Sequence, residues 1–100
     1  MQSNHEGSII DALIDALTTR AAGVVLNAAA YAHTSLAIAD AVRAVAPLPV
    51  IEVHLSNTVA REPMRRRALV GAACLGRIEG LGAEGYCLAL RALARRAQGA

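Results

Sequence analysis

Apolar positions recur at helical spacing in three parts of the chain, and each predicts an amphipathic helix. The first helix is expected to begin at a capping box formed by Ser3 and Glu6. The second is capped by Thr34 or Ser35 and is broken by Pro47-Leu48-Pro49, and the third follows a glycine-rich stretch near the C-terminus. The expected inward-facing residues are Ile10, Leu13, Ile14 and Leu17 in the first helix, Ile38, Val42 and Val45 in the second, and Tyr86, Leu90, Leu93 and Ala97 in the third.

Three apolar runs lie between these helices and predict buried strands, at residues 23–28, 50–53 and, with the weakest pattern, 72–78. The charged segment 58–67 is expected to be a loop or a short helical turn. Alternating helices and strands predict an α/β fold, with a parallel sheet of about three strands and helices on both faces. A chain of 100 residues without a repeat or linker is expected to be a single domain.

Polar clusters follow two of the predicted strands. Residues 27–35 come directly after Gly23-Val24-Val25-Leu26, and residues 52–57 come directly after Pro49-Val50-Ile51. Ligands of open α/β sheets bind beyond the carboxyl ends of the strands. The two clusters are therefore expected to converge on one crevice.

Glu52 and His54 are expected to be neighbours, because residues two apart in a strand face the same side. A carboxylate beside an imidazole fixes its tautomer and stabilises its protonated form, which suits a general acid. The same pair is also typical of a half-buried histidine whose hydrogen bonds are satisfied at a strand end. The residues alone leave both interpretations open.

Three further groups of polar residues allow a functional and a structural interpretation. Leu55-Ser56 is placed to present backbone N–H groups and a hydroxyl to an anion. Asn27 and His33 are candidates for binding a polyol, or for ordinary strand-end and helix-cap hydrogen bonds. Arg61 and residues 65–67 form either a clamp for a carboxylate or phosphate or a solvated face.

The composition excludes several kinds of site. All ten basic residues are arginines, so neither a Schiff-base lysine nor a phosphate-loop lysine is available. Only 2% of the residues are aromatic and the net charge is +2, which makes nucleic acid a poor candidate partner. The three histidines lack metal-ligand spacing and the glycines lack a dinucleotide-binding spacing, so neither metal nor cofactor is expected.

The cysteines and the hydropathy pattern indicate the cellular compartment of the protein. Cys74 and Cys87 fit no metal spacing and are expected to be buried thiols in a reducing compartment. No apolar run approaches the length of about 18 residues that spans a bilayer, and the N-terminus lacks a signal-peptide pattern. A cytoplasmic location without membrane contact is expected.

Five blocks of this sequence resemble the type II 3-dehydroquinate dehydratases, in that family's order and close to its spacing. The blocks are Gln2-Ser3-Asn4-His5-Glu6-Gly7, residues 27–35, Ile51-Glu52-Val53-His54-Leu55-Ser56-Asn57, Arg61-Glu62-Pro63-Met64-Arg65 and Gly82-Ala83-Glu84-Gly85-Tyr86. The resemblance extends over essentially the whole chain. It implies a flavodoxin-like fold and a homododecamer built from trimers.

The resemblance also implies an activity in the shikimate pathway of aromatic amino acid biosynthesis. The family removes water from 3-dehydroquinate to give 3-dehydroshikimate, by anti elimination through an enolate, without a metal or cofactor. By resemblance His54 matches the general acid that protonates the departing hydroxyl, and Glu52 matches the carboxylate behind it. Leu55 and Ser56 match the pair that receives the substrate carboxylate, largely through backbone N–H groups.

The remaining matches concern the substrate ring and the assembly. Asn27, His33 and Arg65 resemble the residues that hold the ring hydroxyls. Asp40 resembles the acid that reaches the site of a neighbouring subunit.

Several features depart from the family pattern. The family opens with a strand carrying Asn-Gly-Pro-Asn, followed by a lid that bears an essential Arg and the Tyr base. Residues 1–100 contain no such segment, and neither Tyr31 nor Tyr86 matches the base. Ala29 and Ala32 stand where Gly and Thr are common, and Arg67-Ala68 replaces a usual His-Ser pair.

These departures lead to an expectation about the chain as a whole. We expect residues 1–100 to be a single, N-terminally truncated family domain, explained by a start codon placed too late. The strand at residues 23–28 would then lie at an open sheet edge with apolar surface uncovered, which favours poor solubility or oligomerisation. The alternatives are a catalytically inactive homologue that acts as a binding or assembly subunit and, more distantly, an arginine-rich nucleic-acid module.

Overall fold

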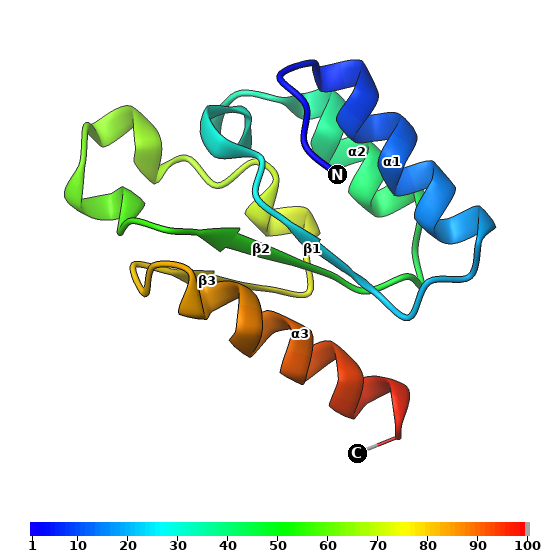
Figure 1. Cartoon of the computed structure of the whole chain (residues 1–100). Helices are drawn as coiled ribbons and strands as arrows, with labels where there is room; N and C mark the ends of the chain where they lie inside the picture. The colour runs from blue at the N-terminus through cyan, green and yellow to red at the C-terminus, as the bar shows by residue number, and fades with distance from the viewer. Residues whose placement is uncertain (100) are drawn as a thin grey trace.

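The structure is a computed structural model that describes residues 1–99. Helices and strands alternate along the described chain as predicted, except that only short 3₁₀ turns separate the second strand from the third (Figure 1). The helices are α1 (Glu6–Thr18), α2 (Leu36–Ala44) and α3 (Glu84–Ala97), and the strands are β1 (Val24–Leu26), β2 (Val50–His54) and β3 (Gly76–Glu79). Short 3₁₀ turns are formed by Ala29–His33, Thr58–Ala60, Pro63–Arg66 and Gly71–Ala73.

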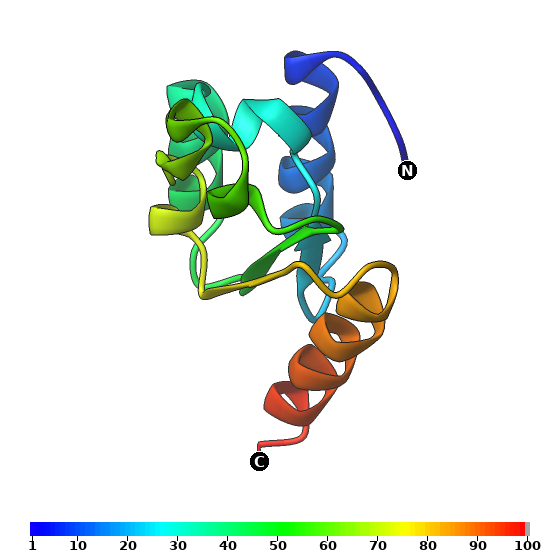
Figure 2. The ribbon, with the colours of Figure 1, turned by 90° about the vertical axis from the view of Figure 1, so that its left-hand side faces the viewer.

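The three strands form one parallel sheet in the order β1-β2-β3. The helices cover both faces of this sheet, with α1 and α2 on one side and α3 on the other (Figures 1 and 2). The predicted α/β architecture, a parallel sheet between flanking helices, is therefore confirmed. As expected, β1 lies at an edge of the sheet, and Val24 and Val25 are only half-buried there.

The central strand β2 separates two cores, because its side chains alternate between the faces. Val50 packs with Leu13, Ile38 and Val42 under α1 and α2. On the opposite face, a second cluster packs under α3; it consists of Ile51, Val53, Ala89 and Leu93. By this alternation Glu52 and His54 share the face of Val50, on the side of α1 and α2.

The start of α1 differs from the prediction. The predicted capping box of Ser3 and Glu6 is wrong. The N-cap is His5, and the hydroxyl of Ser3 accepts a hydrogen bond from His5 N at 3.0 Å. Glu6 instead accepts a hydrogen bond from the Ser35 hydroxyl, which also caps α2 by accepting from Ile38 N at 2.9 Å. A tertiary contact has replaced the local one.

Two predicted helix stripes are partly wrong. In α1, Ile14 and Leu17 are 48% and 41% exposed, because the helix packs through Ile9, Ile10 and Leu13. In α3, Leu90 and Ala97 are exposed, while Gly85, Ala89 and Leu93 are buried. Small residues explain the shift in α3, since a Cβ at Gly85 would lie 3.2 Å from Val53 Cγ1 and the helix therefore approaches β2 closely.

The third strand begins later than predicted, at Gly76 rather than at residue 72. Val70 is fully buried beside α2, and the chain turns through Gly71–Ala73 before it joins the sheet. Within residues 1–99, no helix is both long and apolar enough to cross a membrane.

Candidate functional site

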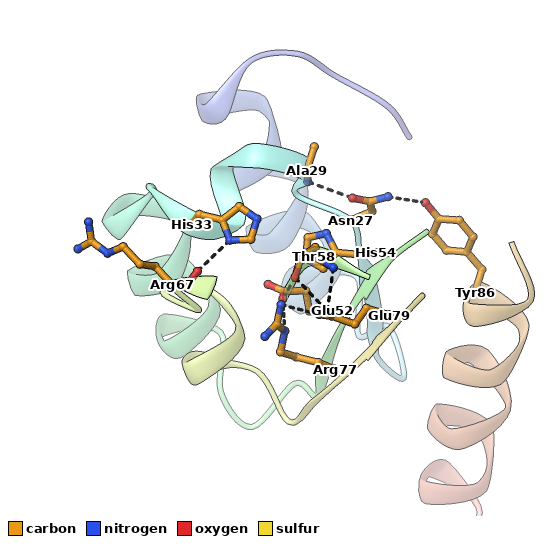
Figure 3. Close-up of polar contacts among 10 residues, drawn as sticks. All are labelled: Asn27, Ala29, His33, Glu52, His54, Thr58, Arg67, Arg77, Glu79 and Tyr86. Carbon is orange, nitrogen blue, oxygen red and sulfur yellow. Dashed lines mark hydrogen bonds and ion pairs between the residues drawn. The ribbon is translucent and has the colours of Figure 1, made fainter. Parts of the chain in front are cut away.

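The carboxylate of Glu52 and the imidazole of His54 lie side by side on β2 (Figure 3). Their exposed fractions are 0% and 5%, so both are buried at the carboxyl end of the central strand. His54 Nε2 lies 3.1 Å from Glu52 Oε1, but outside hydrogen-bond alignment. The two side chains are therefore in close contact without a hydrogen bond between them.

A guanidinium from the adjacent strand completes the neutralisation of Glu52. Arg77 is the register partner of Glu52 across β2 and β3, and its Nε donates to Glu52 Oε1 at 2.6 Å. Its second terminal nitrogen lies 2.8 Å from Glu79 Oε2. One cation thus bridges two carboxylates, one of which is fully buried and requires such a partner.

Glu79 in turn holds the loop that follows β2. Its Oε1 accepts hydrogen bonds from Thr58 N at 3.0 Å and from the Thr58 hydroxyl at 2.9 Å. Burial acts to raise the pKa of Glu79, but the Thr58 hydrogen bonds and the charge of Arg77 outweigh it and leave the pKa lowered. Glu79 therefore remains a carboxylate that anchors the start of Thr58–Ala60.

His33 joins the cluster from the other predicted polar segment. Its ring stacks on His54, with ring centroids 5.9 Å apart and planes inclined by 19°. Its Nδ1 lies 2.8 Å from the carbonyl oxygen of Arg67, and the side chain is buried. The 3₁₀ turn Ala29–His33 after β1 places this histidine at the end of the neighbouring strand.

Asn27 is held by contacts on either side. Its amide nitrogen donates to the hydroxyl of Tyr86 at 2.9 Å, and its amide oxygen accepts from Ala29 N at 3.0 Å (Figure 3). Ala29 has a φ of 51°, a conformation that favours glycine. The alanine at this position therefore holds a strained backbone conformation that a glycine would adopt freely.

Leu55 and Ser56 lie in an exposed turn directly after β2. The Leu55 carbonyl accepts a hydrogen bond from Gly82 N at 3.0 Å. Gly80 packs against Asn57 with a φ of 85°, which a side chain adopts only under strain. The loop between β3 and α3 thus supports the turn.

Arg65 and Asp40 lie apart from this cluster in their contacts. Arg65 donates to Glu62 at 2.6 Å, and this hydrogen bond lowers the pKa of Glu62. Asp40 is exposed on α2, 3.8 Å from Arg43. The contacts found in residues 1–99 do not bring either side chain to His54.

A cavity of about 280 Å³ opens at the carboxyl end of β1. Its lining includes Asn27, Tyr31 and Thr34, together with Ser3 and Asn4 from the N-terminal segment. A second hollow of about 290 Å³ lies near Pro47 and contains none of the candidate residues. The first is the better candidate for a binding site because it includes a predicted ligand-binding residue.

Comparison with known families decides the identity. The family model described as Dehydroquinase class II matches residues 1–94. The chain belongs to this family. Among class II dehydroquinase relatives, the 3-dehydroquinate dehydratase of Chelativorans sp. (strain BNC1) is 60% identical over 95% of this chain and 65% of its own length. That of Mesorhizobium japonicum is 55% identical over the same shares of the two chains.

Solved class II dehydroquinase structures share the fold. The type II dehydroquinase from Butyrivibrio crossotus is 43% identical and superimposes with a TM-score of 0.90, over 93% of this chain and 64% of that one. The enzyme from Propionibacterium acnes gives a TM-score of 0.87 at 42% identity, over 94% and 68%. This chain therefore spans about two-thirds of the length of the dehydroquinases that it resembles.

Four residues of this cluster were not predicted as site residues from the sequence: Arg77, Glu79, Thr58 and Tyr86. A signal for two of them was present, because Arg77 and Glu79 alternate around Ile78 just as Glu52 and His54 alternate around Val53. Gly71, Gly76 and Arg77 make this run the weakest of the predicted strands. In the folded chain, Arg77 contacts both Glu52 on the adjacent strand and Glu79 on its own strand.

Proposed function

We propose that this chain carries the acid side of a dehydratase site that converts 3-dehydroquinate to 3-dehydroshikimate and water. The observation that carries the proposal is the buried His54–Glu52 pair at the carboxyl end of the central strand. The curated relatives cited above are named 3-dehydroquinate dehydratases, which supports the same reaction.

The role of His54 follows from the chemistry of elimination. Removal of the proton beside the substrate ketone moves an electron pair into an enolate; by resemblance, the base is a lid tyrosine that is not among residues 1–100. When the enolate collapses, the C–O bond breaks and the departing hydroxyl takes a proton from His54, leaving as water. Glu52 stabilises the imidazolium before the transfer, and no metal or cofactor takes part.

The remaining family matches supply binding. In the proposal, Leu55 and Ser56 bind the substrate carboxylate in the turn after β2, through backbone N–H groups and the Ser56 hydroxyl. His33 and Asn27 bind ring hydroxyls, with Asn27 exchanging its hydrogen bond to Tyr86 for one to substrate. Arg65 also binds a ring hydroxyl in the proposal, after its hydrogen bond to Glu62 is broken.

Assembly is part of the proposal. Asp40 has an exposed side chain, which suits a residue that acts in the site of a neighbouring copy. We propose a homo-oligomer of trimers that builds a dodecamer, in which residues 1–100 act as one domain. We place it in the cytoplasm as a step of the shikimate pathway, without nucleic-acid or membrane partners.

The test is turnover of 3-dehydroquinate, followed through the conjugated product. It is measured on the 100-residue chain and on the same chain fused behind the N-terminal third of the Chelativorans relative. Activity in either form supports the proposal if His54→Ala reduces it by at least about 100-fold. Absence of turnover from both folded forms would contradict it and would favour the non-catalytic assembly subunit.

A further inference from the structure

We propose that Arg77 is a positioning residue that couples the acid His54 to the carboxylate-binding turn, and that Gly71 makes room for it. The roles given to His54 as the acid and to the turn as the carboxylate-binding site rest on the proposed function. The coupling itself rests on the contacts alone, and it is testable without turnover.

A continuous series of contacts runs through Arg77. His54 faces Glu52 at 3.1 Å, and Arg77 binds Glu52 at 2.6 Å. The same guanidinium lies 2.8 Å from Glu79, which accepts two hydrogen bonds from Thr58. Thr58 is two residues beyond Ser56, so the series ends at the turn proposed to bind the substrate carboxylate.

The charges of this series explain why an arginine stands at its centre. Two carboxylates, Glu52 and Glu79, face one guanidinium and one imidazole. With His54 protonated, the four charges sum to zero, and the fully buried Glu52 has the opposite charge beside it that a buried carboxylate needs. Without Arg77, the fully buried Glu52 would lose its guanidinium partner, and Glu79 would keep only its hydrogen bonds from Thr58.

Gly71 shapes the position of this guanidinium. A Cβ at residue 71 would lie 2.6 Å from Arg77 Cδ, 3.0 Å from its Nε and 3.2 Å from Glu52 Oε1. Arg77 has a flexible side chain and would give way, which would move its Nε from Glu52. Gly71 therefore allows a charge-preserving test of the same contact.

The experiment compares variants of the full chain in labelled samples by NMR. Arg77→Met removes the bridging charge, and Arg91→Met removes an exposed arginine of α3 as a matched control. Gly71→Ala displaces Arg77 without changing charge, and Gly7→Ala is its control, since a Cβ there meets no atom within 4 Å. Arg77→Lys tests whether charge alone restores the signals.

The signals are the Glu79 carboxyl titration, the Thr58 amide and the His54 ring. The charged groups facing Glu79 are Arg77 and His54, and Thr58 supplies its hydrogen bonds. We expect Arg77→Met to raise the pKa of Glu79 and to shift the Thr58 and His54 signals together. Gly71→Ala should shift both signals in the same directions by less, Arg77→Lys should restore the Glu79 titration in part, and the two controls should leave all three signals unchanged.

Arg77→Met spectra that match the unmodified chain at Glu79, Thr58 and His54 would overturn the coupling. So would equal changes in Arg91→Met. If Arg77→Met does not fold, Gly71→Ala decides alone: coupled shifts support the proposal, and unchanged signals refute it. These NMR outcomes do not depend on dehydration of 3-dehydroquinate. The coupling can therefore be refuted while the proposed function holds, and the proposed function can be refuted while the coupling holds.

Discussion

Arg77 and Glu52 are register partners across two parallel strands, and Arg77 Nε lies 2.6 Å from Glu52 Oε1. This ion pair fills a position between the sheet and the 3₁₀ turn at Gly71. It provides the counter-charge that a fully buried carboxylate needs next to His54.

Glu52→Ala should destabilise the fold, because it leaves Arg77 with one carboxylate fewer in a buried site. We expect a loss of about 3 kcal/mol in the free energy of unfolding, measured by urea titration. The control is Glu62→Ala, whose carboxylate forms an exposed pair with Arg65 and should leave the unfolding midpoint unchanged. Equal midpoints for Glu52→Ala and Glu62→Ala would contradict this account of the buried pair.

Because of Glu79, the free energy of unfolding should decrease as the pH is lowered. Its folded-state pKa lies below the unfolded value, so its contribution is complete above about pH 4.3 and is lost as the pH falls through the folded pKa. We expect Glu79→Gln to flatten the dependence of unfolding free energy on pH between about pH 5 and pH 3. A slope as steep as that of the unmodified chain would show that Glu79 does not act in this way.

Cys74 should be the unreactive thiol of the pair. Burial, and then the charge of Glu52, raise its pKa to about 12. At pH 8 only about one Cys74 in 10⁴ is then a thiolate, the reactive form. Iodoacetamide should label Cys87, which is exposed, quickly and Cys74 only in urea. Cys87→Ser should remove the fast reaction, and a fast phase that survives this substitution would refute the assignment.

Much of the fold could be predicted because it depends on local periodicity. The buried run of β2 and the alternation of Glu52 with His54 are visible in sequence. The partner of Glu52 is not, since Arg77 is 25 residues away and meets it only through sheet register. The covered face of α3 was also hidden, because Gly85 sets it by close approach to Val53 rather than by the apolar stripe.

Ala29→Gly should stabilise the chain, since Ala29 is exposed and has a φ of 51°. Relief of the left-handed conformation should exceed the entropic cost of glycine, giving a net gain of up to about 1 kcal/mol. Thermal and urea unfolding measure this gain. Ala30→Gly is the control, because Ala30 does not have positive φ and glycine there should destabilise. Loss of stability in both variants would contradict the strain at Ala29.

The most direct test of the central claim compares two histidine substitutions in the form of the chain that turns over 3-dehydroquinate. His54→Gln removes the proposed acid, and His5→Gln removes an exposed histidine at the N-cap of α1. The measurement is kcat for 3-dehydroshikimate formation in the two variants. We predict a fall of about 100-fold to 10,000-fold for His54→Gln and no change for His5→Gln. An unchanged kcat in His54→Gln would contradict the assignment of His54 as the acid.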